Sequence, residues 1–496
     1  MTEARPGQLP DPDSVLPQAR GLFFDGRWQE AAEGRVFETF SPGSGRALGP
    51  VAEASEADVS AVIAAAHAAF PGWSATPPLE RARCLRELAR IVRENATELA
   101  LLDAIDCGNP VRAMVGDAAI AAAQIELFAG LVTEMKGASI PMGAGRLNVS
   151  VREPLGVVAR ISPFNHPFMF AAAKIAAPLA AGNTVVIKPP EQAPLSALRL
   201  AELAGHLFPP GVFNLVTGST RDVGARIVAD PRVAKVGLIG SVSAGQAVMR
   251  SAAQGLKPVL LELGGKNALI AFADADPDTV AQAIVAGMNF AWCGQSCGST
   301  SRVFLHDALH DAVLERVVHH VTAFTPGMPE RWETTMGALA SKAQYDRTLH
   351  YIETAKAEGA RLLTGGKRPD APELANGYFV EPTIFADVTA DMTIARDEIF
   401  GPVASVLRWH DEAEMMAEVN ALAVGLTCSI WTRDFATALR TATTVEAGYV
   451  WVNEVSKHFV GAPFGGKKHS GIGREECIEE MLSFTELKNI HMKFGA

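Results

Sequence analysis

Short apolar runs alternate with helix-length segments through the middle of the chain. The runs GVVARIS, NTVVIKP, VFNLVTG, KVGLIGS and PVLLELGG start near positions 157, 184, 212, 235 and 258, are rich in β-branched residues and are bounded by Gly or Pro. Each interval between them fits one strand, one helix and two loops. We therefore predict an α/β fold with a doubly wound parallel sheet, formed by residues 1–130 and 151–261, of the type that binds dinucleotides.

The flanking segments have other patterns. Residues 22–55 alternate apolar runs with Gly, Pro and Ser, which predicts hairpin strands. Helical periodicity with acidic starts follows over 56–70 and 79–106 and predicts two or three helices. From residue 262 to 477, strands and helices alternate again, which predicts a second α/β domain.

Two further segments lack a partner within their own domain. Residues 135–156 are broken by Gly and Pro into short strands with few core positions, so we expect this segment to project. The C-terminal tail, IEEMLSFTELKNIHMKF, is amphipathic. We expect the tail to pair with the projecting segment of another subunit, so that residues 131–150 and 478–496 form an oligomerisation arm.

Composition narrows the class of protein. The 496 residues are 48% hydrophobic and 20% charged, which is typical of a globular protein of two or three domains. A net charge of −11 without a dense Lys/Arg run argues against nucleic acid or an anionic membrane as a partner. The polar, Pro-rich N-terminus does not resemble a signal peptide, so we expect a cytoplasmic protein. The six cysteines are scattered and have no zinc-site spacing, so we expect no metal.

Two cysteines occur close together in NFAWCGQSCGSTSR, residues 289–302, a stretch of small and flexible residues that follows a predicted helix. Ser296 and Gly298 flank Cys297 with small side chains that would leave its sulfur open to a ligand. Cys297 is therefore a candidate nucleophile. The alternative is that it packs as a small apolar residue, as most free cysteines do, and this is how we interpret Cys293.

Polar residues follow the first two predicted strands, where ligands bind in doubly wound sheets. Asn165 could donate its amide to an oxyanion, or could serve only the turn beside Pro. Lys188 and Glu191 could hold an adenosine ribose, and the carboxylate would repel a 2′-phosphate and so favour NAD over NADP. The alternative for this pair is a solvated turn.

The next three strand ends are also suited to a cofactor. Gly218 and Gly224 after the third strand, and Gly240 and Ser241 after the fourth, offer backbone N–H groups and a helix N-terminus to a diphosphate, although each motif alone is common. Glu262 lies in an apolar run after the fifth. Burial there would raise its pKa toward that of a general base, whereas an exposed position would leave it a solvated carboxylate.

Together these motifs resemble the aldehyde dehydrogenase superfamily from about Leu22 to the C-terminus. SPFNHPF, KPPE, the loop from Gly218 to Gly224, IGS, ELGGKN, GQSC, DEIFGPV, WVN and PFGGKKHSGIGREE occur in the family's order and at about its spacing. The resemblance implies an NAD-binding domain, a catalytic domain over residues 262–477 that carries the nucleophilic cysteine, and a β oligomerisation arm. It also implies a homodimer or a homotetramer.

The resemblance assigns roles to single residues. Cys297 matches the nucleophile and Glu262 the general base, and Asn165 matches the oxyanion donor that works with the Cys297 backbone N–H. Lys174 and Glu475 match residues that pass protons to and from the base. The implied cofactor is NAD, and the candidate cofactor-binding residues are Ser162, Pro163, Phe164, Lys188, Glu191, Gly218, Gly224, Gly240, Ser241, Leu263, Gly264, Glu398 and Phe400.

The implied reaction oxidises a small-molecule aldehyde to its carboxylic acid. A thiohemiacetal and then a thioester would form on Cys297, and water activated by Glu262 would hydrolyse the thioester. The presence of Glu262 favours hydrolysis over transfer of the acyl group to coenzyme A. A coenzyme A-acylating enzyme and a catalytically silent NAD-binding protein are the alternatives.

The sequence departs from the family pattern near the expected substrate tunnel. His166 replaces a usual apolar residue, and Ala173 replaces a bulky aromatic one, which predicts room for a bulky or aromatic aldehyde. Lys457 or His458 could meet a polar or anionic group of the substrate, or could face solvent. The candidate substrate-binding residues are His166, Phe168, Met169, Ala173, Ser296, Gly298, Lys457 and His458.

Overall fold

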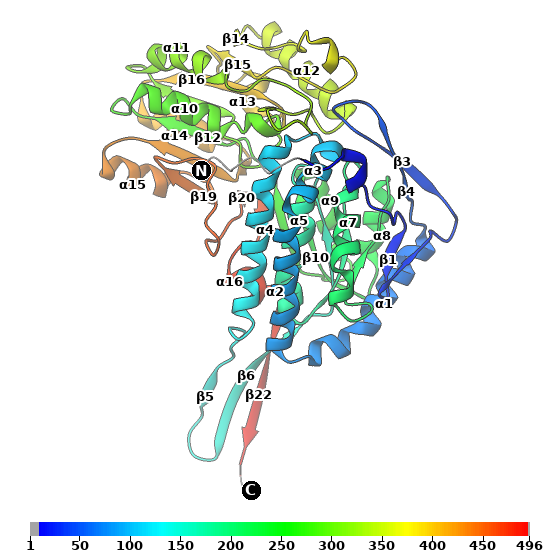
Figure 1. The fold of residues 1–496 in the computed structure, drawn as a ribbon. Helices are drawn as coiled ribbons and strands as arrows, with labels where there is room; N and C mark the ends of the chain where they lie inside the picture. The colour runs from blue at the N-terminus through cyan, green and yellow to red at the C-terminus, as the bar shows by residue number, and fades with distance from the viewer. Residues whose placement is uncertain (1–8, 495–496) are drawn as a thin grey trace.

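The computed structural model describes residues 9–494, and its first lobe is built on an eight-stranded sheet (Figure 1). The strand order is β2-β1-β9-β8-β7-β10-β11-β21. Its five central strands are parallel and start close to the predicted positions: β7 (Val157–Ile161), β8 (Thr184–Lys188), β9 (Phe213–Leu215), β10 (Val233–Gly240) and β11 (Val259–Leu263). The antiparallel edge strands are β1 (Leu22–Phe24), β2 (Arg27–Gln29) and β21 (Gly471–Ile472).

Helices cover both faces of this sheet, because alternate residues of its strands point to opposite sides. In β7 and β8, Val158, Val185 and Ile187 pack into one apolar core, whereas Val157 and Val186 pack into another. The first core lies under α2 (Pro78–Glu94), α3 (Ala96–Cys107), α4 (Val111–Leu131), α5 (Pro167–Ala173), α6 (Ala176–Ala181) and α7 (Leu195–Ala204). The second lies under α1 (Glu56–Ala75), α8 (Arg221–Ala229) and α9 (Val242–Ala253). The predicted doubly wound sheet is confirmed.

Helix α4 is long and apolar enough, by length and composition, to cross a membrane. Half of its apolar stretch is nevertheless buried inside the protein, where α4 packs against α2 and α3. This is the environment of a core helix.

The second lobe contains a seven-stranded sheet of order β14-β15-β16-β13-β12-β18-β19. Its parallel strands are β12 (Ala268–Ala271), β13 (Arg302–His306), β15 (Thr383–Ala386), β16 (Val403–Trp409), β18 (Thr427–Trp431) and β19 (Tyr449–Val452), and β14 (Arg361–Thr364) is antiparallel. The helices of this lobe are α10 (Pro277–Gly287), α11 (His310–Val321), α12 (Lys342–Ala357), α13 (Thr393–Arg396), α14 (Glu412–Asn420) and α15 (Phe435–Thr444). A single apolar core joins this sheet to its helices.

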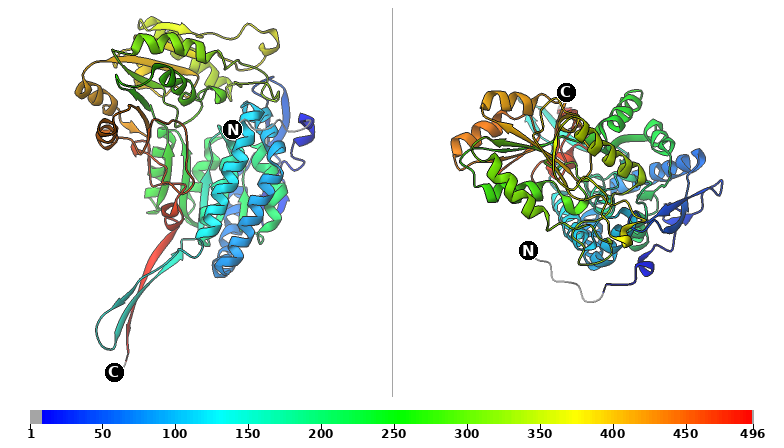
Figure 2. Two further views of the ribbon diagram at one scale, coloured as in Figure 1. Left: turned by 60° about the vertical axis from the view of Figure 1, so that its left-hand side comes forward. Right: turned by 90° about the horizontal axis from the view of Figure 1, so that it is seen from above.

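A three-stranded arm projects from the first lobe (Figures 1 and 2). It consists of β5 (Ser139–Pro141), β6 (Arg146–Pro154) and β22 (Thr485–Lys493), with β6 in the middle. The tail therefore pairs with the projecting segment of its own chain, and our expectation that it pairs with that of another subunit is wrong. The reason is the docking of α16 (Ile478–Leu482) against α6, which brings the start of β22 beside the end of β6.

The remaining strands form two small pairs. The hairpin β3 (Val36–Phe40) and β4 (Ala47–Ala52) precedes α1, and β17 (Val424–Gly425) pairs with β20 (Lys467–Lys468). The bounds of the arm differ from the expected residues 131–150 and 478–496. Strand β6 continues to Pro154, and α16 packs on the first lobe.

Candidate active site

A cavity of about 310 Å³ lies where the strand ends of the first lobe meet the loop that carries Cys297. It brings together residues that are far apart in the sequence. The expected site residues that line it are Asn165, His166, Met169, Lys174, Glu262, Ser296, Cys297, Gly298, Lys457, His458 and Glu475. The cavity therefore holds all five residues to which catalytic roles were assigned.

The loop before Cys297 is tightly folded. Asn289 and Cys293 adopt left-handed backbone conformations, both with φ of 54°. Gly294 has φ of 66°, and a Cβ there would lie 2.3 Å from the carbonyl oxygen of Gly401, so only glycine fits. Asn267 Nδ2 donates a hydrogen bond of 2.6 Å to the Cys297 carbonyl. These contacts hold Cys297 at the cavity.

Cys293 is packed away from the cavity. Its side chain is fully buried and its Sγ donates a hydrogen bond of 3.0 Å to the Gly337 carbonyl. Burial raises the pKa of this thiol. A buried thiol with a high pKa is a poor nucleophile, so Cys293 has a packing role.

Glu262 lies near the end of β11 and lines the same cavity as Cys297. Burial, with repulsion from Glu475, raises the pKa of Glu262 to about 8. Burial also raises the pKa of Cys297 well above its usual value, and the neighbouring Glu262 adds to the shift. The thiol is therefore protonated in this arrangement, and Glu262 can accept a proton only in its ionised form, which predominates above about pH 8.

Asn165 follows β7 and is held through its backbone, because Asn109 Nδ2 donates a hydrogen bond of 2.7 Å to its carbonyl oxygen. Among the described residues, no hydrogen bond uses the Asn165 side-chain Nδ2 or the backbone N–H of Cys297. Both groups belong to residues that line the cavity. They are therefore available to an oxyanion formed there.

Lys174 and Glu475 belong to a buried ion cluster behind Glu262. Glu475 meets Lys174 Nζ at 3.0 Å and Arg160 Nη2 at 2.8 Å. Burial alone would raise the pKa of Glu475, but attraction to Lys174 and Arg160 outweighs it and lowers the pKa to about 2. Glu475 is thus ionised at neutral pH, which argues against a role as a proton carrier. Arg160 was not identified from the sequence.

Two expected substrate residues lie elsewhere. Phe168 and Ala173 are buried in the core of the first lobe and do not line the cavity. Met169, Phe170 and Lys174 line it instead. Phe170 and Lys174, four positions apart, share one face of this short helix, and Phe168, two positions before Phe170, is on the opposite side. The expectation for Phe168 and Ala173 is therefore corrected.

Helix α4 contributes residues to the cavity that were not predicted from the sequence. Asp117, Ile120 and Gln124 line the cavity from this helix. Asp117 and Gln124 lie two helical turns apart and are separated only by apolar residues, and this spacing could have identified them. Aromatic walls from Phe170, Trp292, Trp451 and Phe464 were missed too.

The expected cofactor residues lie at one edge of the first sheet. They lie at the ends of β7, β8, β9, β10 and β11 or directly after them, in the ranges 162–164, 188–191, 218–224, 240–241 and 263–264. Glu398 and Phe400 precede β16 of the second lobe. Lys188 is buried, with Nζ 3.8 Å from Glu191. At Gly240 an added Cβ would meet nothing closer than 3.7 Å, so the N-terminus of α9 behind it stays open. These donors fit a dinucleotide diphosphate and ribose.

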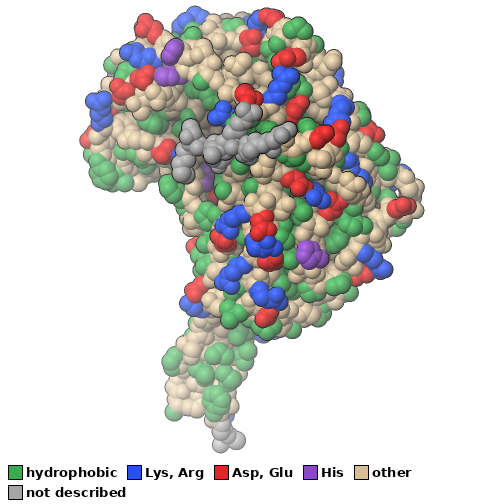
Figure 3. Space-filling view, viewed as in Figure 1, with side chains coloured by type: hydrophobic (Ala, Val, Ile, Leu, Met, Phe, Trp, Pro, Cys, Tyr) green, Lys and Arg blue, Asp and Glu red, His purple; other side chains and the backbone are tan. Residues whose placement is uncertain are grey.

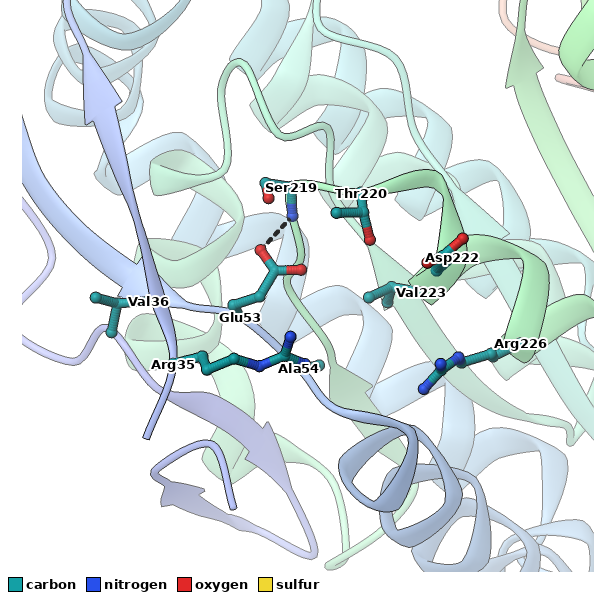
Figure 4. Close-up of a pocket in the computed structure, with 9 residues that line it drawn as sticks. All are labelled: Arg35, Val36, Glu53, Ala54, Ser219, Thr220, Asp222, Val223 and Arg226. Atoms are coloured by element: carbon teal, nitrogen blue, oxygen red, sulfur yellow. Dashed lines mark hydrogen bonds between the residues drawn. The ribbon is translucent and has the colours of Figure 1, made fainter. Parts of the chain in front are cut away.

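The loop after β9 is hydrogen-bonded to Glu53, the residue that follows the hairpin β3–β4. The Glu53 carboxylate accepts a hydrogen bond of 2.7 Å from the Ser219 backbone N–H (Figure 4). Arg35 and Arg226 lie beside this contact and line a second cavity, of about 400 Å³. Cys297 and Glu262 do not line the second cavity, so the reacting groups belong to the first.

The second lobe closes the nicotinamide side of the expected cofactor site. Gly265 donates its backbone N–H to Glu398 Oε1 at 3.1 Å, and burial raises the pKa of Glu398 to about 7. A Cβ on Gly264 would lie 1.9 Å from a Glu398 oxygen. The rings of Phe164 and Phe400 meet edge to face, with centroids 5.7 Å apart. These residues fit an NAD ribose and ring between the two lobes.

Known proteins are similar to this chain in sequence and in fold. A model of the aldehyde dehydrogenase family matches residues 28–490. The aldehyde dehydrogenase tropH of Talaromyces stipitatus is 52% identical over 98% of this chain and 96% of its own length. A betaine aldehyde dehydrogenase of Cereibacter sphaeroides is 41% identical over 96% of this chain and 98% of its own.

Solved structures agree with these relatives. The NAD⁺ complex of an aldehyde dehydrogenase from Bacillus cereus superposes with a TM-score of 0.94 at 38% identity, covering 97% of this chain and 98% of that one. The match to the family extends over nearly the whole chain, and the strand ends and Cys297 loop are arranged around one cavity. The chain therefore belongs to the aldehyde dehydrogenase family and is an oxidoreductase that uses NAD to oxidise aldehydes.

Proposed function

We propose that this enzyme oxidises a bulky or ring-bearing aldehyde to its carboxylic acid through a thioester on Cys297. The observation that carries the proposal is that Cys297, Glu262 and Asn165 line one cavity together. The aromatic walls formed by Trp292, Trp451 and other rings suit a flat, apolar substrate body.

Attack begins when the Cys297 sulfur bonds to the aldehyde carbon and its proton leaves to solvent through the cavity. Negative charge on the former carbonyl oxygen is stabilised by the Asn165 amide and the Cys297 backbone N–H, each contributing about 3 kcal/mol. When bound, NAD⁺ supplies the acceptor for the hydride that the tetrahedral carbon loses. The product of this stage is a thioester on Cys297.

Hydrolysis then regenerates the enzyme. After the first proton has left through the cavity, Glu262 takes a proton from water while the water oxygen attacks the thioester carbon. The carbon–sulfur bond breaks, the acid leaves and Cys297 recovers its proton. Because Lys174 and Arg160 keep Glu475 ionised, we assign to Glu475 and Lys174 the positioning of Glu262.

The cofactor would lie across the strand ends. Lys188 and Glu191 would hold the adenosine ribose, the loops at Gly218 and Gly240 the diphosphate, and Glu398 the second ribose. The carboxylate of Glu191 is half exposed and would repel the 2′-phosphate of NADP, so the preferred cofactor would be NAD.

The proposal is tested by measuring the rise in NADH absorbance when the enzyme is mixed with NAD⁺ and each of a panel of aromatic and aliphatic aldehydes. We expect turnover with the wild type, none with Cys297→Ala, and a single burst without turnover for Glu262→Gln. Acceleration by coenzyme A with formation of an acyl-coenzyme A would instead support the acylating alternative. Absence of NADH from every aldehyde, with or without coenzyme A, would point to a silent NAD-binding protein.

We further propose a cytoplasmic homodimer or homotetramer. Residues 1–130 and 151–261 would bind NAD, 262–477 would supply the catalytic cysteine, and 131–150 with 478–496 would join subunits. Strand β22 is an edge strand, and the arm exposes Ile140, Met142, Leu487 and Ile490. Figure 3 shows hydrophobic side chains on the surface of the arm. Open strand edges and exposed apolar side chains favour association. Sedimentation velocity of the full chain and of Leu487→Lys tests this; a monomeric wild type would refute it.

A further inference from the structure

A buried histidine–aspartate pair lies in the wall of the substrate cavity. His166 Nδ1 and Asp117 Oδ2 are 2.7 Å apart, and both side chains are almost fully buried. Asp117 is on α4 and His166 caps α5, so two separate elements hold the pair. Both residues line the cavity that contains Cys297.

The other ring nitrogen of His166 is left for a ligand. Asp117 occupies Nδ1, and among the hydrogen bonds of residues 9–494 none uses Nε2. The bond to Asp117 requires a proton on Nδ1 when the carboxylate is ionised, so a protonated ring also presents an N–H donor at Nε2. Because His166 lines the cavity, a group bound there can accept a hydrogen bond from this donor.

Aromatic rings hold the imidazole in place. The ring of Trp292 meets it edge to face with centroids 4.6 Å apart, and Phe170 does so at 5.8 Å. These contacts and the Asp117 bond restrict rotation about both side-chain torsions. A donor held in this way distinguishes ligands by the position of their acceptor atom.

Charge favours the protonated ring. Burial alone would lower the pKa of His166, but attraction and hydrogen bonding to Asp117 outweigh burial and raise the pKa, with a smaller contribution from Asp103 on α3. Hydrogen bonds from a charged donor are stronger than those from neutral ones. The negative groups that face His166 are thus Asp117 and Asp103, and both favour the imidazolium.

We propose that His166 Nε2 donates a hydrogen bond to a second oxygen of the substrate, so that the enzyme prefers ring aldehydes that carry a hydroxyl, oxyanion or carbonyl oxygen near the formyl group. The inference rests on the proposed function. His166 directly follows Asn165, the expected donor to the aldehyde oxygen, and both line the same cavity, so the acceptor that His166 recognises would lie near the formyl group. His166 would thus set specificity, and Asp117 would position it.

The test compares kcat/KM for benzaldehyde with that for 2-, 3- and 4-hydroxybenzaldehyde. A hydrogen bond from a charged donor predicts that the wild type prefers at least one hydroxybenzaldehyde by about 10- to 100-fold. In His166→Phe, which keeps a ring of similar size, this preference should fall below about threefold. His166→Gln, which keeps an N–H donor, should retain part of the preference. His206→Phe, the same substitution at an exposed position that does not line the cavity, is the matched control and should retain all of it.

Three outcomes overturn the proposal. The wild type could turn over benzaldehyde as efficiently as every hydroxybenzaldehyde, the preference could survive in His166→Phe, or His166→Phe could lower kcat/KM for all four aldehydes by one factor. The last outcome would indicate a role in folding or in holding the aldehyde oxygen. If His166→Phe does not fold because Asp117 loses its partner, the double variant His166→Phe/Asp117→Leu removes both polar groups and is compared in the same way.

A binding measurement separates this inference from the proposed function. Calorimetric titration of Cys297→Ala with benzaldehyde and with the hydroxybenzaldehydes reports recognition without turnover. Tighter binding of a hydroxybenzaldehyde that depends on His166 supports the inference even if Cys297 proves not to be the nucleophile. Equal binding of all four aldehydes overturns the inference, and leaves the assignment of Cys297 and Glu262 to the NADH assay.

Discussion

Arg160 donates a hydrogen bond of 2.8 Å to Glu475 across 315 positions of the sequence, and both side chains are almost fully buried. Arg160 is on β7, behind the cavity, and the same carboxylate also meets Lys174. A buried carboxylate with two cationic partners stays ionised, so its charge is a fixed part of the electrostatic field around Glu262. It contributes to the raised pKa of Glu262 through repulsion.

Replacing Arg160 with Met should destabilise the protein, because Glu475 would lose one of its two buried partners. We expect the free energy of unfolding to fall by about 3 kcal/mol or more. Urea denaturation monitored by circular dichroism measures it. Arg93→Gln, which breaks the half-exposed pair with Glu126, is the matched control and should cost about 1 kcal/mol or less. Equal losses in the two variants would contradict a special role for the buried pair.

The turnover rate should rise with pH in the range set by Glu262. Its pKa is raised to about 8, so below that pH the group is mostly protonated and cannot take a proton from water. Steady-state turnover limited by hydrolysis should therefore increase from pH 6 to 9 with a midpoint near 8. Stopped-flow measurement of the burst and of the following steady phase separates the two steps. In Glu262→Gln the steady phase should be lost at every pH; a persisting steady phase with the same midpoint would assign the titration to another group.

The two cysteines of the active-site loop should differ in function. Cys293 is fully buried and bonded to Gly337, so Cys293→Ala should keep turnover within about threefold and affect mainly stability, by about 1 kcal/mol. Cys297→Ala should abolish turnover. Mass spectrometry after iodoacetamide treatment should find label on Cys297, reduced when aldehyde and NAD⁺ are present. Label on Cys293 with retained activity would reverse the assignment.

Gly264 should be required for cofactor binding. An added Cβ would lie 1.9 Å from a Glu398 oxygen, so Gly264→Ala must displace the Glu398 carboxylate. We expect KM for NAD⁺ to rise by about tenfold, the loss of one hydrogen bond to a charged group. Gly72→Ala is the matched control, because a Cβ there meets nothing within 4 Å in helix α1, and it should leave KM unchanged. An unchanged KM in Gly264→Ala would remove Glu398 from the cofactor site.

Glu191 should determine the choice between NAD and NADP. Its carboxylate lies 3.8 Å from Lys188 Nζ at the end of β8. Replacing it with Gln removes the charge that would repel a 2′-phosphate, and leaves Lys188 to attract one. We expect the ratio of kcat/KM for NADP⁺ to that for NAD⁺ to rise by about tenfold in Glu191→Gln. A ratio equal to that of the wild type would place the adenosine ribose elsewhere.

The sequence alone predicted the parallel sheet and the residues at its strand ends. Strand periodicity is local, and parallel strands necessarily bring their carboxyl ends to one edge, so residues after β7, β8 and β11 could be expected to meet. Cys297 could also be predicted as a site residue, because its small neighbours and the family motifs are local features of the sequence. These inferences need no knowledge of how distant surfaces fit together.

Only the tertiary structure decided the pairs that join distant elements. His166 meets Asp117, 49 positions away, because α4 packs across α5, and Arg160 meets Glu475 because β21 adds to the edge of the first sheet and brings the chain after it against β7. The tail pairs with β6 of its own chain because α16 docks on α6, and Phe170 rather than Phe168 faces the cavity because of the rotation of a single short helix. Such contacts depend on the relative position and rotation of whole elements, which are set by side-chain packing over the entire core and leave no periodic signal in the sequence.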